Sequence, residues 1–291
     1  VVSQPDRPAG RKLQLTASAV KVLALENNLP VITPENLKKE PAMLEMIKSW
    51  QADVAVVVAF GQILSQEFLD SFKFGAVNIH GSLLPLWRGA APIQRSIEAG
   101  DKVTGVSLQR MVKKLDAGAV IGQRVIDING EVTASELYEK LSLLGCDLLQ
   151  QELIRYVKGE IEAKVQDEQK VTLAPKIEKA EALVDWSWSA EKIHNRVRAF
   201  NMGPGTHVVF QGKRLKIHKT KIQEKISVGA VNTVGTIFLL SASELHIQTG
   251  QGVIALVEVQ PESKSKISID EFIKSFGLHE NGKFKKGDFF V

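Results

Sequence analysis

The sequence predicts an α/β protein in which a doubly wound sheet precedes a smaller, β-rich domain. Three observations predict this fold class. The chain has 291 residues, which is more than one small domain usually contains. Strand and helix patterns alternate up to about residue 171, as is typical of a doubly wound sheet. From Thr172 onward, short strand patterns separated by Gly, Asn and Ser indicate a small barrel or sandwich.

The composition excludes several classes of protein. Hydrophobic residues make up 44% of the chain and charged residues 24%, which argues against wholesale disorder and against a fibrous repeat. The longest apolar run, residues 54–60, is too short to cross a bilayer. Cys146 is the only cysteine, so no internal disulfide can form, and the Cys and His spacing of a zinc site is absent. We therefore expect a reducing compartment.

The first domain, residues 1–171, is expected to begin with two helices. Apolar residues recur at helical spacing in residues 16–28, and residues 34–50 begin with a proline, which suits the first turn of a helix. Residues 52–60 are nearly all apolar. Such a run predicts a central parallel strand that helices cover on both faces.

The rest of this domain is expected to contain a strand, a helix and two further strands before a long helix. In order, the four shorter elements are residues 76–80, 90–99, 103–111 and 120–128. A capping box at residues 133–136 and a glycine at position 159 mark the two ends of the long helix. Cys146 lies on the predicted apolar side of that helix, so we expect it in the core.

The second domain, residues 172–291, is expected to contain one helix and several short strands. The helix is predicted at residues 191–200. The strands are predicted at residues 208–210, 215–218, 236–240, 245–249 and 253–259.

The positive charge of the chain belongs to the second domain. Residues 1–171 carry 20 Lys and Arg against 21 Asp and Glu, a net charge of −1, whereas residues 172–291 carry 17 against 12, a net charge of +5. A basic face on a small barrel suits a polyanion such as RNA, and the alternative is an ordinary solvated strand. The basic residues are densest at Lys213, Arg214, Lys216, Lys219 and Lys221, with His218 among them, and at Lys283, Lys285 and Lys286.

Asn78 and His80 are the first candidates for catalysis. Side chains two apart on a strand project to the same side, and these two lie at the strand end where α/β sheets bind ligands. An amide donor beside an imidazole suits a carbonyl that becomes an oxyanion. The alternative is that Asn78 bonds loop backbone and His80 is a hydrogen-bonded core histidine, and spacing alone favours it.

Asp116 is the third candidate. Its sequence context, Asp-Ala-Gly, is typical of a turn, and that interpretation needs no catalytic role. In the functional interpretation, its carboxylate orients His80 or relays a proton. That role requires a proximity that the sequence cannot establish.

Two adjacent motifs resemble a known enzyme family. The stretch Asn-Ile-His-Gly-Ser-Leu-Leu-Pro at residues 78–85, followed by Trp-Arg-Gly-Ala-Ala-Pro-Ile-Gln at residues 87–94, resembles the signature of the 10-formyltetrahydrofolate-dependent formyltransferases. The second motif and the basic second domain point to the member of the family that acts on methionyl-tRNA. Supporting segments are residues 4–11, 115–118, 184–186 and 198–201, so the resemblance runs from end to end.

The resemblance implies a Rossmann-like domain, an OB-like β-barrel and roles for particular residues. Asn78, His80 and Asp116 match the catalytic trio of the family, with no metal required. The segment Ser82, Leu83, Leu84 and Pro85 matches the folate-binding segment. The implied partners of a monomeric protein are 10-formyltetrahydrofolate and initiator methionyl-tRNA. The residues expected to contact tRNA are Arg7, Arg11, Lys12, Lys213, Arg214 and Lys216.

Two departures from the family pattern and two alternative functions accompany this resemblance. The family begins with a strand and a helix before the segment matching Val1, roughly one β-α unit, and we expect the native protein to have them. Lys12 and Leu13 stand where a glycine and a basic residue are usual. One alternative is a formylfolate hydrolase or a formyltransferase for a nucleotide or sugar amine, which would not need a basic barrel. The other is a non-catalytic RNA-binding protein on the same scaffold.

Overall fold

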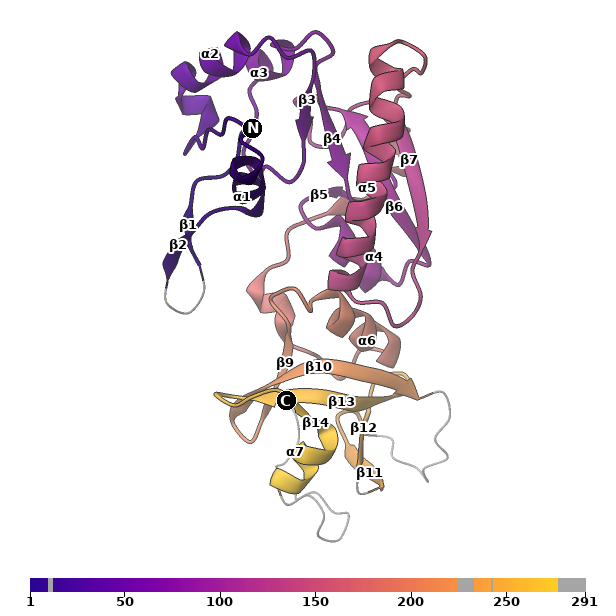
Figure 1. Ribbon diagram of the computed structural model, residues 1–291. Coiled ribbons are helices and arrows are strands. Elements are labelled where there is room, and N and C mark those ends of the chain that lie inside the picture. The colour runs from indigo at the N-terminus through magenta and orange to yellow at the C-terminus, as the bar shows by residue number, and fades with distance from the viewer. Residues whose placement is uncertain (10–12, 224–232, 242, 277–291) are drawn as a thin grey trace. The chain divides into compact units, whose positions relative to one another are not determined.

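The computed structural model divides the chain into two compact units (Figure 1). It describes residues 1–9, 13–223, 233–241 and 243–276. The first unit consists of Val1–Pro85, Val106–Arg124 and Gly145–Val171. The second unit consists of Leu86–Gly105, Val125–Leu144 and Thr172–Val291, so one of its segments begins at Thr172. Because the second unit also includes two segments from the first half of the chain, this division does not test the single domain boundary expected at residue 172, which stays a prediction.

A mixed sheet in the order β3-β4-β6-β7 carries the candidate catalytic strand (Figure 1). Its strands are β3 (Ala55–Val57), β4 (Ala76–His80), β6 (Val103–Arg110) and β7 (Val120–Asp127). β3 runs parallel to β4, whereas β6 runs antiparallel to β4. The chain therefore has the α/β architecture that was expected, but its sheet is mixed.

The expectation of a central strand at residues 52–60 is wrong. β3 is only three residues long and lies at the end of the sheet order. The side chains of Val56 and Val58 are 42% and 57% exposed, so helices do not cover both faces of this run. Apolar composition gives the tendency to form a strand, but it does not say whether a neighbour covers each face.

The long helix α5 (Ala134–Val157) packs on one face of the sheet. A Cβ atom added to Gly145 of α5 would lie 3.0 Å from Cγ2 of Ile79, and one added to Gly122 of β7 would lie 3.1 Å from Cδ1 of Leu148. Glycine at these two positions therefore allows a close approach of helix and sheet. Since Ile79 faces α5, the side chains of Asn78 and His80 face the other side.

Both predicted ends of α5 are confirmed. Thr133 Oγ1 accepts from the N–H of Glu136 at 3.4 Å, and Glu136 Oε2 accepts from the N–H of Thr133 at 2.8 Å. The N–H and the hydroxyl of Thr133 both donate to the Glu136 carboxylate, and these two bonds hold the pKa of that carboxyl below its usual range. Gly159 has a φ of +75°, the left-handed conformation typical of a helix C-terminus. Cys146 is exposed rather than buried, so its expected place in the core is wrong.

The remaining elements of the first unit are a hairpin and several short helices. The hairpin consists of β1 (Arg7–Ala9) and β2 (Gln14–Thr16). Buried side chains of the α2 and α3 segments form one hydrophobic cluster with Leu37 and Ala76. The helix expected over residues 16–28 is shorter, and the one expected over residues 34–50 begins at Pro41 instead of Pro34. The helices are α1 (Ala19–Glu26), η1 (Leu37–Lys39), α2 (Pro41–Ser49), α3 (Gln66–Asp70) and η2 (Glu168–Lys170).

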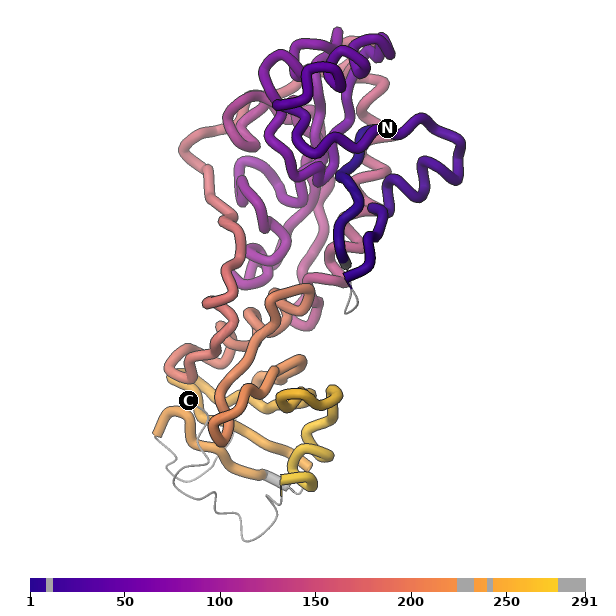
Figure 2. The backbone as a smooth tube through the Cα atoms, turned by 90° about the vertical axis from the view of Figure 1, so that its left-hand side faces the viewer, coloured from indigo at the N-terminus to yellow at the C-terminus, as the bar shows by residue number. Residues whose placement is uncertain are grey.

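The second unit contains an antiparallel sheet in the order β11-β12-β13-β10-β9, with β14 on β13 (Figure 1). The segments of this sheet are coloured orange to yellow in Figure 2. Its largest hydrophobic cluster joins this sheet to two helices, α6 (Ala190–Ala199) and α7 (Ile269–Ser275). The predicted helix and strands of this region are confirmed within a few residues. The strands are β9 (Thr206–Phe210), β10 (Lys213–Gln223), β11 (Ile237–Ser241), β12 (Glu244–Gln248), β13 (Val253–Pro261) and β14 (Ile267–Ser268).

Short elements complete the second unit. The two-residue strands β5 (Arg88–Gly89) and β8 (Leu173–Ala174) pair in parallel, and α4 (Pro92–Ala99) and η3 (Lys179–Ala182) lie in the same unit. The helix expected at residues 90–99 is thus confirmed, with Gly100 as its left-handed C-cap. Of the helices in the described part of the chain, none combines the length and the apolar character that crossing a bilayer requires.

Candidate active site and basic surface

Asn78 and His80 lie at the carboxyl end of β4, on the face of the sheet opposite α5. In the register of β4 and β6, Asn78 is opposite Gln109 and His80 is opposite Ser107. The His80 side chain is buried, whereas Asn78 is half-buried. Within the described residues, the Asn78 amide makes no side-chain hydrogen bond. Its two N–H donors are therefore available to a ligand.

The structure brings Asp116 to His80. Asp116 lies in the loop between β6 and β7, and its Oδ2 is 3.7 Å from Nδ1 of His80. The two side chains are only 12% and 7% exposed, so water screens their interaction weakly. At 3.7 Å the contact is longer than a hydrogen bond and acts electrostatically when the imidazole is protonated. The proximity that the sequence left open is thus present.

The turn that carries Asp116 is fixed by its neighbours. Asp116 has a φ of +47°, an uncommon conformation for a residue other than glycine. Nε2 of Gln166 donates to the carbonyl oxygens of Asp116 at 2.8 Å and of Gly118 at 2.7 Å. A Cβ atom at Gly118 would lie 1.6 Å from the carbonyl oxygen of Arg110, so only glycine fits there. These contacts determine where the Asp116 carboxylate points.

Gln109 orients the Asp116 carboxylate itself. Its Nε2 donates to Oδ1 of Asp116 at 3.0 Å. The Gln109 side chain is buried, and its Oε1 atom has no hydrogen-bond partner among the described residues. A buried acceptor without a partner is costly in a folded protein, so this atom suits a donor on a bound ligand or an ordered water.

Sequence reasoning missed Gln109 and Gln166. Gln109 had a detectable signal, since it is a polar residue near the end of the strand predicted at residues 103–111. The burial of β6 is continuous from Thr104 to Gln109, so a polar residue at this position requires a partner. Gln166 had no such signal, because it acts on a turn about 50 residues earlier in the chain.

The segment Ser82–Pro85 follows β4 directly. Ser82 and Leu84 are buried, whereas Leu83 and Pro85 are half-buried. The Leu84–Pro85 peptide bond is cis. Alternate side chains of the segment therefore turn away from the core, immediately beyond His80.

Arg7 is the described part of the predicted tRNA-contacting loop. It lies in β1, and its guanidinium forms an exposed ion pair with Oε2 of Glu35 at 2.9 Å. Arg11 and Lys12 lie outside the described residues.

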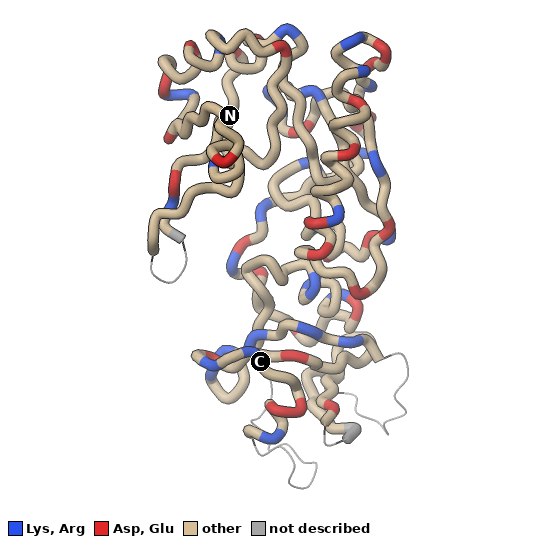
Figure 3. Tube along the Cα trace, viewed as in Figure 1, with Lys and Arg blue, Asp and Glu red and all other residues tan. Residues whose placement is uncertain are grey.

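β10 carries five exposed basic residues, which we call the basic strand: Lys213, Arg214, Lys216, Lys219 and Lys221. Figure 3 shows the blue segments along this strand. Arg214, Lys216, Lys219 and Lys221 lie on one face, and Lys213 lies at the start of the strand. Leu215, Ile217 and Thr220 are buried on the other face. A bulge between Ile217 and Lys219 interrupts the alternation, and it keeps Lys219 and Lys221 on the exposed side. The basic residues expected at Lys283, Lys285 and Lys286 lie outside the described residues.

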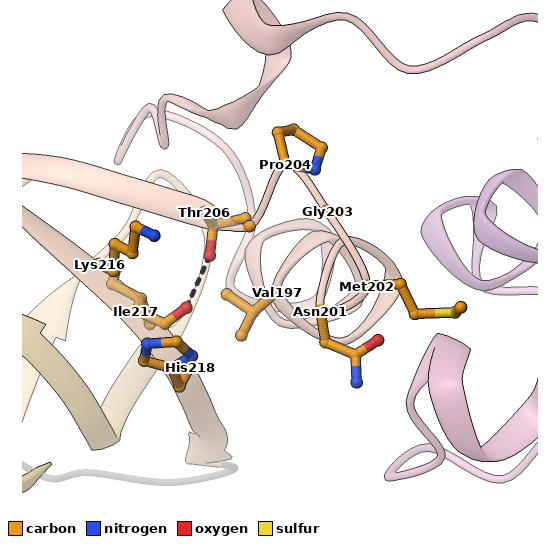
Figure 4. Close-up of a pocket in the computed structure, with 10 residues that line it drawn as sticks. Val197, Asn201, Met202, Gly203, Pro204, Thr206, Lys216, Ile217 and His218 are labelled. Atoms are coloured by element: carbon orange, nitrogen blue, oxygen red, sulfur yellow. Dashed lines mark hydrogen bonds between the residues drawn. The ribbon is translucent and has the colours of Figure 1, made fainter. Parts of the chain in front are cut away.

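A pocket of about 210 Å³ lies beside the basic strand in the second unit (Figure 4). Lys216 and His218 line one side of it, and Gly203, Pro204 and Gly205 line another (Figure 4). Thr206 Oγ1 donates to the carbonyl oxygen of Ile217 at 3.0 Å. Nε2 of His218 lies 3.1 Å from Oε1 of Gln260. The pocket adds to this strand a concave feature that is lined by both polar and apolar residues and includes the basic side chain of Lys216.

Metal ligands do not converge in the part of the chain that the structure describes. There, no group of three His, Cys, Asp or Glu side chains could hold a metal ion. The chemistry available at the first unit's site is that of an amide, an imidazole and a carboxylate.

Two family models together match most of the chain. The model described as formyl transferase matches residues 1–153, and the formyl transferase C-terminal domain matches residues 176–277. A methionyl-tRNA formyltransferase from Bdellovibrio bacteriovorus is 56% identical over 279 residues, which is 96% of this chain and 87% of the relative. Another, from Coxiella burnetii, is 41% identical over 278 residues, covering 95% of this chain and 87% of the relative.

Solved structures share the fold. HypX from Aquifex aeolicus in complex with tetrahydrofolic acid matches with a TM-score of 0.63 and 17% identity over 92% of this chain. The match covers 47% of HypX, so this chain spans about half of that protein. The sugar 3N-formyltransferase WlaRD matches with a TM-score of 0.61 and 20% identity, over 85% of this chain and 82% of WlaRD. At these identities the likeness shows the fold alone.

Proposed function

Because the chain belongs to the formyltransferase family, we propose that it transfers the formyl group of 10-formyltetrahydrofolate to the amino group of initiator methionyl-tRNA. It is a formyl-transferring enzyme, and its curated relatives along nearly the whole chain act on methionyl-tRNA. The observation that carries the chemical part of the proposal is the 3.7 Å contact of Asp116 and His80 at the end of β4. The product, N-formylmethionyl-tRNA, serves translation initiation.

The three polar side chains suit the steps of formyl transfer. The reaction forms a bond between the methionyl nitrogen and the formyl carbon, and it breaks the bond from that carbon to N10 of the folate. One proton of the amine ends on N10. The Asn78 amide donates to the formyl oxygen as it gains negative charge, together with protonated His80. Asp116 orients the imidazole and helps to move the amine proton.

The residues around this site fit a folate that carries the formyl group. Oε1 of Gln109 is a buried acceptor that a donor on the ligand can satisfy. Leu83 and Pro85 offer half-buried apolar surface just beyond His80, and such surface suits the flat ring system of a folate. Ser82, Leu83, Leu84 and Pro85 are therefore the proposed folate-binding segment. Metal-free chemistry is part of the proposal, since each step uses only amide, imidazole and carboxylate groups.

The basic strand supports tRNA as the second substrate. Lys213, Arg214 and Lys216 lie exposed on one strand of the second unit, where they can bind phosphates without burying an unpaired charge. We propose that this sheet is an OB-like barrel, that residues 1–171 form a Rossmann-like catalytic domain, and that the monomer acts in the cytosol of a bacterium or an organelle matrix. Arg7, Arg11 and Lys12 are proposed to contact the acceptor end of the tRNA.

Formyl transfer to purified tRNAs tests the proposal. The protein is incubated with 10-formyltetrahydrofolate and either initiator or elongator methionyl-tRNA, and N-formylmethionine is measured after mild hydrolysis. We expect faster formylation of the initiator. Neutralising Lys213, Arg214 and Lys216 should raise KM for the tRNA. Turnover on a nucleotide-linked amino sugar but not on methionyl-tRNA would overturn the proposal, as would tRNA binding without any transfer.

A further inference from the structure

Two polar side chains hold the main chain of the Ser82–Leu84 segment. Ser107 lies on β6 and Gln123 on β7, and both belong to the first unit. Oγ of Ser107 accepts from the N–H of Leu84 at 3.0 Å and donates to the carbonyl oxygen of Ser82 at 2.7 Å. Nε2 of Gln123 donates to the carbonyl oxygen of Leu84 at 3.0 Å. Side chains therefore supply hydrogen bonds that a further strand would otherwise make.

These two side chains also bond to each other, which uses every hydrogen-bond donor that they have. Nε2 of Gln123 donates to Oγ of Ser107 at 2.8 Å, so both of its N–H groups have partners. A hydroxyl has one donor and two acceptor sites, and the Ser107 hydroxyl uses all three. Ser107 is fully buried, where a satisfied network is rigid and an incomplete one is costly.

The position of Ser107 connects this network to the catalytic strand. Ser107 is directly opposite His80 in the register of β4 and β6. The residue that holds the proposed folate segment therefore also flanks the imidazole. A change in the network shifts Ser82–Leu84 relative to His80, because the segment follows His80 after a single glycine.

We propose that Ser107 and Gln123 are positioning residues that fix the main chain of Ser82–Leu84 for folate binding. This inference rests on the proposed function, since it assigns the segment to the folate. Neither residue touches the reacting atoms in this assignment. Both act through the backbone that they hold, so they set the affinity for the folate and leave the affinity for tRNA unchanged.

The first test is direct binding of tetrahydrofolate, measured by titration calorimetry without tRNA. Ser107→Ala leaves the buried N–H of Leu84 unpaired, and we expect it to weaken tetrahydrofolate binding about tenfold. Gln123→Glu keeps the shape of the side chain but removes both donors, so a similar loss is expected. Because the two residues share a hydrogen bond, their effects should not be independent. The fold-loss of tetrahydrofolate affinity in the double variant should therefore be smaller than the product of the fold-losses in the two single variants. Ser107→Thr, which keeps the hydroxyl, should bind more tightly than Ser107→Ala.

Steady-state kinetics separate positioning from a merely structural role. In Ser107→Ala, KM for 10-formyltetrahydrofolate should rise about tenfold while KM for methionyl-tRNA stays within about twofold. Ser96→Ala is the matched control. Ser96 is equally buried and donates to the carbonyl oxygen of Ile93 at 3.0 Å, but it lies in the second unit, so folate binding should not change.

The outcomes distinguish this inference from the proposed function. A Ser107→Ala protein with a lower melting temperature but wild-type tetrahydrofolate affinity overturns the positioning role. A wild-type protein that binds no tetrahydrofolate overturns it as well. If the wild type binds tetrahydrofolate with the expected sensitivity to Ser107→Ala but formylates no methionyl-tRNA, the proposed function fails and the positioning role stands.

Discussion

Gly118→Ala tests whether the turn that carries Asp116 determines activity. The added Cβ atom would lie 1.6 Å from the carbonyl oxygen of Arg110, whereas real Cβ contacts are essentially never shorter than 3.0 Å. The turn or the end of β6 must therefore shift by about 1.4 Å, the difference between these two distances. A shift of this size moves the Asp116 carboxylate away from its present 3.7 Å approach to His80. Because a misplacement of about 1 Å can cost about 10²-fold in rate, we expect kcat to fall by that order.

The assay is single-turnover formyl transfer at saturating substrates, together with a thermal melt. Gly130→Ala is the matched control, since a Cβ atom there meets nothing within 4 Å and its φ is also outside the left-handed region. A second variant, Gln166→Leu, removes the two bonds to the turn without adding a clash, and its kcat should fall by a smaller factor of about 10. Wild-type kcat in a folded Gly118→Ala protein would refute the reasoning.

Three further predictions follow from the same contacts and charges. Asn78→Ala should lower kcat by about 10²-fold or more with an unchanged melting temperature, since it removes one oxyanion donor, and near wild-type turnover contradicts that role. The affinity for methionyl-tRNA, measured by filter binding, should fall steeply with salt, and replacing both Arg214 and Lys216 by Gln should reduce the slope of log Kd against log salt by about 2. Burial lowers the pKa of His246, whose two ring nitrogens have no hydrogen-bond partner among the described residues. Below about pH 6.5 the unfolded chain then binds more protons than the folded protein, so the free energy of unfolding should fall as the pH falls. His246→Leu should make the free energy of unfolding, measured by urea titration from pH 5 to 8, less dependent on pH.

The sequence predicts the candidate site best where the chain geometry is local. A period of two places Asn78 and His80 on one side of a strand, and β4 has the predicted bounds of Ala76–His80. The two ends of α5 were equally predictable, because a capping box and a C-terminal glycine act within one turn of the helix.

The sequence is a weaker guide where a property depends on distant neighbours. The apolar run at residues 52–60 shows a tendency to form a strand, but its exposure depends on elements elsewhere in the fold. The contact between Asp116 and His80 joins positions 36 residues apart, and Gln166 holds the Asp116 turn from 50 residues away. No local pattern encodes such pairs, because they arise only when β4, β6 and β7 assemble into one sheet.

The polar face of this sheet explains why the catalytic side chains lie where they do. Burying polar groups is unfavourable unless each finds a partner, and Ser107 and Gln123 do so through one another and through the Ser82–Leu84 backbone. In the described part of this face, two groups have no hydrogen-bond partner: the Asn78 amide and Oε1 of Gln109. Asn78 and Gln109 are opposite each other in the register of β4 and β6. An amide that can donate and an acceptor that lacks a donor, adjacent on neighbouring strands, are complementary to a ligand that offers both a carbonyl oxygen and an N–H group. The folded protein therefore leaves available the polar atoms that the formyl oxygen and an N–H group of the attacking amine can satisfy, and it satisfies the atoms that hold them in place.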